Sequence, residues 1–273
     1  MSPPATATAT TSIDFHVLIP ARLASTRLPE KVLADLAGRP LIVRVWEQVS
    51  VAGAASVHVA TDCERIAAAV RSAGGEVVMT GSDHDSGTSR LAEAAATLRL
   101  DADAIVVNVQ ADEPLVPVEC LHQLAGLLAA DPTARMATLW TAADDRAQWM
   151  DPNVVKLVAG RDGRALYFSR APIPALRDRN DRDQADHEDW PAALARRHVG
   201  LYAYRVDALR EWSRLPESML ERAESLEQLR ALEAGWPIAC APACAEIPPG
   251  VDTPADLEAM RERFGRIVGG HRS

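Results

Sequence analysis

A cationic loop follows the first apolar run of the chain, residues 15–19. Arg22, Arg27 and Lys31 lie within ten positions of one another, and Ser25 adds a hydroxyl between them. Guanidinium forks and a lysine ammonium are groups that hold phosphate oxygens in proteins. Scattered basic residues more often form a solvated surface. A position directly after a predicted buried strand favours a phosphate site instead, because ligands of α/β proteins bind beyond the carboxyl ends of the strands.

An acidic pair follows another apolar run, Val106–Val109. Asp112 and Glu113 come just past its end and directly before Pro114. Mg²⁺ in proteins typically takes one or two carboxylates together with phosphate oxygens and water. A turn before the proline explains the same residues equally well. Position alone therefore leaves both a metal site and a turn open.

A third carboxylate lies near the C-terminus. Asp252 precedes Thr253 and Pro254, which are a good helix cap and a good first helical residue. The cap does not need Asp252, so this side chain is available as a second metal ligand or as an ordinary loop carboxylate.

The segment from Ser86 to Arg90 has the features of a helix start. Ser86 or Thr88 can cap the helix, and Gly87 permits close approach of a base or ribose to the backbone. Arg90 lies in the first turn, where the helix dipole disfavours a cation. Its position suggests an anionic partner.

Two further patterns could form a binding floor. Period-two alternation places His198, Gly200, Tyr202 and Tyr204 on one face of a predicted strand, although a solvated edge strand gives the same pattern. Within a helix predicted over Met219–Ala234, Glu224 and Gln228 lie one turn apart on a common face. Such pairs are usually surface residues.

The elements that would position these residues are strands and helices that alternate along the chain. Strands are predicted over Phe15–Ile19, Ser56–Thr61, Glu76–Met79, Ala104–Val109 and Met136–Trp140. Helices are predicted over Pro40–Ala52, Glu64–Ala73, Thr88–Leu98 and Pro117–Ala129. This alternation predicts an α/β fold with a mostly parallel sheet. Beyond residue 140 we expect a hairpin (Val154–Ala159 with Arg164–Phe168), an exposed charged loop (Arg177–Arg197), strands Val199–Tyr204 and Ile238–Cys240, and a last helix Pro254–Arg266.

Composition limits the class of protein. The formal net charge of −9 over 273 residues argues against nucleic acid as the main partner. The four cysteines show neither disulfide nor zinc spacing, so we expect reduced thiols and a cytoplasmic protein. No apolar run is long enough to cross a membrane. Residues 1–14 are rich in Ala, Thr and Pro and are expected to form a disordered tail.

Taken together, these clusters resemble the 3-deoxy-manno-octulosonate cytidylyltransferase family, also called CMP-Kdo synthetases. The similar stretches run in family order from Phe15 to about Arg263: IPARLASTRLPEK, TGSDHDSGTSRLAE, IVVNVQADEPLVP, DPNVVK, ALYFSRAPIP, RHVGLYAYR, ESLEQLR and GVDTPADLEAMR. The NVQ-x-DEP run, ALYFSRAPIP and H-x-G-x-Y together are specific to this family.

The resemblance implies a fold, a reaction and partners. It implies a Rossmann-like nucleotidyltransferase, here a single domain over residues 15–273 with an inserted dimerisation subdomain at about 141–205, which forms a homodimer. The reaction would transfer CMP from CTP to 3-deoxy-D-manno-octulosonate (Kdo), with Mg²⁺, to give CMP-Kdo and pyrophosphate for the lipopolysaccharide inner core. The motifs fit Kdo and an 8-amino analogue of it alike.

The resemblance also assigns residues by position. The nucleotide would be held by Arg22, Ser25, Arg27, Lys31, Ser86, Gly87 and Arg90. The sugar acid would be surrounded by Gln110, Arg170, His198, Tyr202, Glu224 and Gln228. Asp112 and Asp252 would bind Mg²⁺, and together with Lys31 and Arg27 they would form the catalytic group.

Two positions depart from the family pattern. Ala111 stands where the family usually has glycine, and Glu30 stands where its LPGKPL motif has glycine, which places an acid beside Lys31. Two rival functions are the synthesis of another sugar nucleotide, such as CMP-sialate, and an idle nucleotide-binding protein with the same fold. The pair of carboxylates argues against the idle protein, which needs no second one.

Overall fold

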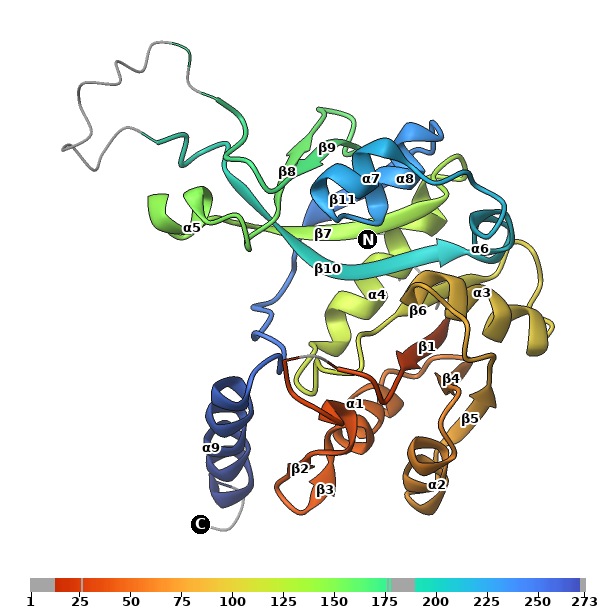
Figure 1. Cartoon of the computed structure of the whole chain (residues 1–273). Helices are drawn as coiled ribbons and strands as arrows, with labels where there is room; N and C mark the ends of the chain where they lie inside the picture. Colours follow the sequence, from red (N-terminus) through yellow and green to blue (C-terminus); the bar gives the residue numbers. More distant parts are fainter. Residues whose placement is uncertain (1–12, 26, 176, 178–189, 271–273) are drawn as a thin grey trace, which may run out of the picture.

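One mixed sheet of nine strands runs through the computed structural model, which describes residues 13–25, 27–175, 177 and 190–270. Seven strands follow one another across the sheet in the order β11-β7-β10-β6-β1-β4-β5, and the β8–β9 hairpin joins it beside β10 (Figure 1). Their bounds are β1 His16–Ala21, β4 Ser56–Thr61, β5 Glu76–Met79, β6 Ile105–Asn108, β7 Met136–Ala142, β8 Lys156–Ala159, β9 Ala165–Ser169, β10 Arg196–Arg205 and β11 Ile238–Pro242.

The parallel part of the sheet is centred on β1. This strand pairs in parallel with β4 on one side and with β6 on the other, so that Val17 lies opposite both Val57 and Val107. The chain leaves β1 toward β4 and later returns to pair on the opposite edge of β1. Such a reversal of strand order opens a crevice at the carboxyl ends of the two strands. The loops after β1 and β6 therefore meet there.

Helices cover both faces of the sheet. Helices α1 (Leu41–Ser50), α2 (Glu64–Ser72) and α4 (Val118–Ala130) pack on one face, and α3 (Gly87–Thr97), α6 (Val206–Trp212) and α8 (Gln228–Glu233) pack on the other. Alternation within β1 explains the two cores, because Val17 and Ile19 enter the first while Leu18 enters the second. The predicted α/β fold with a mostly parallel sheet is confirmed.

The later strands add antiparallel pairs. Strand β10 runs antiparallel to β6, β7 and β8. Its register against β7 shifts between Val199 and Tyr202. His198 still stacks near Tyr202, and Tyr202 near Tyr204, with ring centroids 5.4 Å and 5.9 Å apart. The predicted common face of these side chains is therefore confirmed despite the irregularity.

The single helix predicted over Met219–Ala234 is wrong. The structure has α7 (Met219–Glu224) and α8, separated at Ser225, which adopts a left-handed conformation with φ 51°. Buried Leu226 anchors the connection. Glu224 therefore ends one helix and Gln228 begins the next, so the common helical face expected for them does not exist.

The remaining elements lie at the periphery. They are a 3-10 turn Lys31–Leu33, strands β2 (Asp35–Leu36) and β3 (Arg39–Pro40), and helices α5 (Arg146–Met150) and α9 (Pro254–Gly270). Helix α9, at the blue end of the chain in Figure 1, packs Leu257 and Met260 against Leu36 and Leu41. None of the described helices is long and apolar enough to cross a membrane. Residues 1–12 of the expected tail and 178–189 of the expected charged loop lie outside the described residues.

Candidate active site

A recess of about 550 Å³ opens where the loops after β1 and β6 meet. Its walls carry most of the predicted phosphate-binding residues and both predicted metal ligands: Pro20, Arg22, Ala24, Ser25, Arg27, Lys31, Val32, Gln110, Ala111, Asp112 and Asp252. The crevice beside β1 therefore brings together the cationic loop and the two carboxylates that the sequence singled out.

A second recess, of about 450 Å³, adjoins the first. The two recesses share Gln110, Asp112 and Asp252. The rest of the second recess is lined by Gly87, Thr88, Asn108, Glu113, Gly200, Tyr202, Tyr204, Ser225, Leu226, Glu227, Gln228 and Gly250. One side of the shared wall is thus cationic, and the other presents hydroxyl, amide and carboxyl groups.

Lys31 lies between the two carboxylates at the shared wall. Its Nζ donates to Asp112 Oδ2 at 2.6 Å and to Asp252 Oδ1 at 2.9 Å. Arg27 also pairs with Asp252 Oδ1 at 3.0 Å. Burial alone would lower the pKa of Lys31, but the charges of the two aspartates and their hydrogen bonds outweigh it and raise the pKa. The ammonium is therefore charged.

A close backbone contact holds the two carboxylate loops together. Val251 N donates to Asp112 O at 2.9 Å. A Cβ at the neighbouring Gly250 would lie 3.2 Å from the same oxygen, so glycine allows this approach. Thr253 Oγ1 caps helix α9 by accepting from Asp256 N at 3.2 Å. As predicted, the cap leaves the Asp252 carboxylate free to face Lys31.

The donor set fits a divalent cation that also binds a ligand. Asp112 and Asp252 already share one cation, the Lys31 ammonium, so their oxygens lie within reach of a single ion. Across the described part of the chain, no group of three or more His, Cys, Asp or Glu residues could hold a metal. Two carboxylates completed by phosphate oxygens and water match the preference of Mg²⁺.

Glu113 differs from its neighbour Asp112. Its Oε2 is buried and has no hydrogen-bond partner among the described residues. Burial, and then the charge of Asp112, raises its pKa to about 8. Asn108 Oδ1 is also buried and finds no partner in the described part of the chain, and both residues line the second recess. A buried acceptor without a partner is costly, so this wall is prepared for a polar ligand.

The acid at position 30 does not disturb Lys31. Glu30 adopts a left-handed conformation with φ 53°, which explains why glycine suits this position in the family motif. Its carboxylate turns to Arg65, with N···O distances of 2.5 Å and 2.8 Å. Ala111, the other position that differs from the family pattern, is outside the left-handed region and lines the first recess. Neither substitution removes a charged group from the recess.

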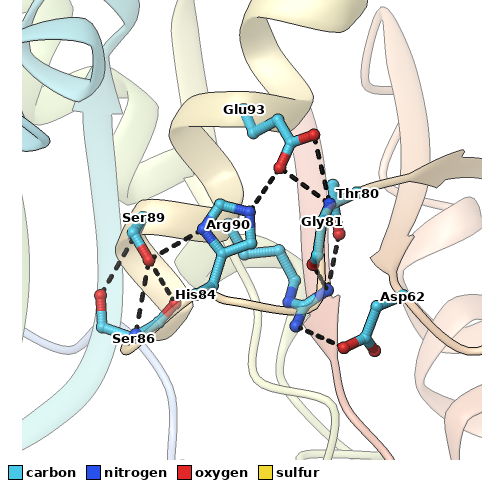
Figure 2. A network of polar contacts seen from close by, with 8 residues as sticks. All are labelled: Asp62, Thr80, Gly81, His84, Ser86, Ser89, Arg90 and Glu93. Carbon is cyan, nitrogen blue, oxygen red and sulfur yellow. Dashed lines mark hydrogen bonds and ion pairs between the residues drawn. The ribbon is translucent and has the colours of Figure 1, made fainter.

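The predicted nucleotide residues after β5 occupy two different settings. Ser86 caps α3 by accepting from Ser89 N at 3.1 Å, and Gly87 lines the second recess. Arg90 has its anionic partner inside the protein: its guanidinium donates to Thr80 Oγ1 at 2.6 Å and to Asp62 Oδ2 at 3.3 Å (Figure 2). Arg90 is only 4% exposed. These partners explain a cation in the first turn of a helix without a ligand.

The predicted sugar residues form an inner and an outer group. Gln110, Tyr202 and Gln228 line the recess. Arg170 and Glu224 are absent from its lining, and they bind each other, since Arg170 N donates to Glu224 Oε2 at 2.8 Å and Arg170 Nε donates to Glu224 O at 2.6 Å. The remaining guanidinium nitrogens of Arg170 donate to Pro152 O and Ser225 O. Arg170 thus fixes the Ser225 turn, which does line the recess.

His198 lies behind Tyr202. Its ring packs against Phe168 with centroids 5.0 Å apart, and its Nε2 is 3.0 Å from Thr138 Oγ1. Burial lowers the pKa of His198 to about 3, so the imidazole is neutral. It is a poor candidate for a general base, which works best when its pKa lies near the operating pH.

The lowered pKa of His198 predicts a pH dependence of stability. The unfolded chain protonates His198 below pH 6.5, while the folded chain keeps it neutral down to about pH 3. Unfolding therefore takes up a proton in that range, and the free energy of unfolding falls on acidification by at most about 1.4 kcal/mol per pH unit. Urea unfolding at pH 7, 5.5 and 4.5 measures this. His198→Gln should flatten the profile, and an unchanged profile would show that His198 is not the group responsible.

Sequence reasoning missed part of the second recess. Thr88 Oγ1 donates to Glu227 Oε2 at 3.0 Å, and burial raises the pKa of Glu227. Tyr204 completes this corner. The sequence indicates only a capping role for Thr88, and it singles out Glu224 and Gln228 rather than Glu227. The polar face of β10 was the signal that could have led to them, because it continues to Tyr204.

Comparisons with known proteins agree with this geometry. A family profile described as "Cytidylyltransferase" matches residues 16–240. The 3-deoxy-manno-octulosonate cytidylyltransferase of Leptothrix cholodnii is 50% identical over 93% of each chain. The enzyme of the same name from Hahella chejuensis is 50% identical over 90% of this chain and 96% of its own.

Solved structures give the same result. A CMP:2-keto-3-deoxy-manno-octonic acid synthetase complexed with CTP superposes with a TM-score of 0.82 at 42% identity, over 93% of this chain and 99% of that one. A cytidylyltransferase from Leptospira borgpetersenii, 15% identical, superposes with a TM-score of 0.59 over 93% of this chain and 87% of that one, and shares the fold.

Proposed function

The chain belongs to the 3-deoxy-manno-octulosonate cytidylyltransferase family, and from this premise we propose how its two recesses divide the reaction. The enzyme transfers CMP from CTP to Kdo and releases pyrophosphate, a reaction that supplies CMP-Kdo for the lipopolysaccharide inner core. In our proposal the first recess binds CTP and the second binds Kdo. The observation that carries this division is the shared wall, where Asp112 and Asp252 border both recesses.

The chain's own residues act mainly by positioning and by charge. The 2-hydroxyl of Kdo attacks the α-phosphorus of CTP in line with departing pyrophosphate. Lys31 and Arg27 neutralise the charge that accumulates on the leaving group, and Arg22 and Ser25 help to hold the triphosphate. The resemblance assigns Ser86, Gly87 and Arg90 to the nucleotide. Gly87 lines the second recess, and Ser86 and Arg90 bind partners within the protein, so we propose that these two position the start of α3. No protein nucleophile is required.

Mg²⁺ completes the proposed site. Asp112 and Asp252 would hold it, and when bound it would supply a Lewis acid that lowers the pKa of the attacking hydroxyl. For the carboxylates to accept it, Lys31 has to give up its present contacts with both. The triphosphate offers Lys31 new anionic partners. Binding of the nucleotide therefore favours release of Asp112 and Asp252 from Lys31, which makes them available to the metal.

On the sugar side, Gln110, Tyr202 and Gln228 are proposed to contact Kdo directly. Arg170, His198 and Glu224 are proposed to act one layer behind, by fixing the Ser225 turn and the Tyr202 ring. An alternative role for Arg170 is to hold the sugar carboxylate directly in its guanidinium fork. To do so it would have to release the three backbone carbonyls that it now binds.

Gln228→Ala tests the sugar side. Gln228 is buried at the start of α8, and a Kdo hydroxyl left without its partner would cost about 1–3 kcal/mol. We expect the KM for Kdo to rise by roughly five- to a hundredfold while the KM for CTP stays nearly constant. Steady-state kinetics with each substrate varied in turn measure both. Gln148→Ala, at a partly exposed position in α5 outside both recesses, is the matched control. Equal losses for both substrates would contradict the division into two recesses.

Three further properties belong to this proposal. We propose a single domain over residues 15–273 whose inserted segment, about 141–205, pairs two copies into a homodimer; exposed Met150, Leu166 and Leu194 support an interface there. The protein is proposed to act in the cytoplasm. Sedimentation equilibrium measures the mass of the protein in solution. The mass of a single chain would contradict the proposed homodimer.

The assignment is tested by a substrate panel. Pyrophosphate release is measured with Kdo, 8-amino-Kdo and N-acetylneuraminate, each with CTP, ATP and GTP, with and without Mg²⁺. We expect activity with CTP, a sugar acid of the Kdo type and Mg²⁺. Preference for N-acetylneuraminate would contradict the Kdo assignment. Activity with 8-amino-Kdo alone would identify that analogue as the substrate.

A further inference from the structure

Two cysteines far apart in sequence lie in contact outside both recesses. Cys120 Sγ, in the first turn of α4, is 3.7 Å from Cys244 Sγ, in the segment after β11. Cys120 is buried and Cys244 is exposed. Within the described part of the chain, neither Cys63 nor Cys240 forms a hydrogen bond with this pair.

The contact is held in place by a neighbouring side chain. Gln123 Nε2 donates to Pro242 O at 2.7 Å, and Gln123 Oε1 accepts from Cys244 N at 2.9 Å. One amide therefore fastens both ends of the Pro242–Cys244 turn to α4. Ala243 N adds a bond to Trp140 O at 2.8 Å. The two sulfurs therefore lie in contact where hydrogen bonds hold the backbone around Cys244 against α4.

We propose that Cys120 and Cys244 are an oxidation site that forms an intramolecular disulfide with hydrogen peroxide as the oxidant. The exposed sulfur reacts first: the Cys244 thiolate attacks peroxide, the O–O bond breaks, and a sulfenic acid and hydroxide result. Cys120 sulfur then attacks the sulfenic sulfur, the S–O bond breaks, and its hydroxyl leaves as water with the proton of the Cys120 thiol. Two thiols lose two electrons and one peroxide becomes two waters.

The setting favours this order of events. Burial, together with the contact with Cys244, raises the pKa of Cys120 to about 11, so Cys120 stays a thiol at neutral pH and resists direct oxidation. The sulfenic acid forms where solvent reaches it, with the resolving sulfur already in contact. Closure by a sulfur that is already in contact should protect Cys244 from oxidation beyond the sulfenic state.

The bond should also stabilise the fold. It would join positions separated by 124 residues, and closing a long loop restricts the unfolded chain strongly. We expect oxidation to raise Tm by about 5 °C or more, and dithiothreitol to reverse the rise.

The experiment treats the full chain with a small excess of hydrogen peroxide, alkylates the remaining thiols under denaturing conditions and maps peptides by mass spectrometry. The expected result is a linked peptide pair containing Cys120 and Cys244, with Cys63 and Cys240 alkylated. Cys240→Ser, which alters another buried thiol, should still form the link and show the Tm rise.

Cys244→Ser is the decisive variant, because an exposed position tolerates the change. It should fold as the wild type does and lose both the link and the Tm rise. Cys244 recovered as sulfinic acid beside an alkylated Cys120 would overturn the proposal. Links between chains, or a different pairing within one chain, would overturn it as well.

Discussion

Replacement of Asp112 or Asp252 by asparagine is expected to lower turnover by about a hundredfold or more and to change the dissociation constant for CTP only a few-fold. Each substitution keeps the shape of the side chain and removes one of the two charges that face the reacting centre. Preorganised charge of this kind acts mainly on the transition state, so its loss lowers kcat rather than nucleotide binding.

Stopped-flow or steady-state pyrophosphate release measures kcat, and calorimetry with CTP measures binding. Asp103→Asn, at an exposed position away from both recesses, is the matched control and should behave as the wild type does. Wild-type turnover in either Asp112→Asn or Asp252→Asn would eliminate the two-carboxylate metal site.

Lys31→Ala should damage both binding and turnover, by about 10²–10³ in kcat/KM for CTP. The change removes a phosphate-binding ammonium, and it also leaves Asp112 and Asp252 facing each other without their shared cation. The weaker binding of CTP separates this variant from the aspartate variants, in which CTP binding is nearly retained.

Kinetics with CTP varied at saturating Kdo measure the loss, and a thermal melt shows whether the variant is folded. Arg39→Gln removes another cation, paired with Glu47 and half-exposed, at a distance from the recesses. It serves as the control for net charge. Unchanged constants for CTP in Lys31→Ala would show that the loop after β1 is an ordinary solvated surface.

The parts of the site that could be predicted from sequence are those set by chain direction. Parallel strands all deliver their loops to one edge of the sheet, so Lys31 after β1 and Asp112 after β6 had to approach each other once the strands were recognised. The cap at Thr253 left Asp252 open as a ligand or a loop carboxylate, and only the family resemblance assigned it to the metal.

The parts that could not be predicted depend on tertiary partners. Arg90 binds Thr80 and Asp62, which lie 10 and 28 residues before it in the sequence. No local sequence pattern predicts these two contacts. The left-handed turn at Ser225 is stabilised from outside the helix, since Arg170 donates to Ser225 O and Glu224 O. Local propensity favoured one long helix there, and these contacts overrode it.

The distribution of lysine makes the site a selective target for reagents that modify amines. The chain has two lysines, Lys31 and Lys156, and all its other basic side chains are arginine or histidine. Lys156 is fully buried, with its ammonium donating to the backbone oxygens of Asp151, Val154 and Arg170. Apart from the terminal amine, an aldehyde or activated ester in solution therefore meets one side-chain amine, and that amine stands between the carboxylates of the reaction centre. Reagents that usually modify many lysines on a protein surface should here modify only the Nζ of Lys31, and bound CTP should protect it.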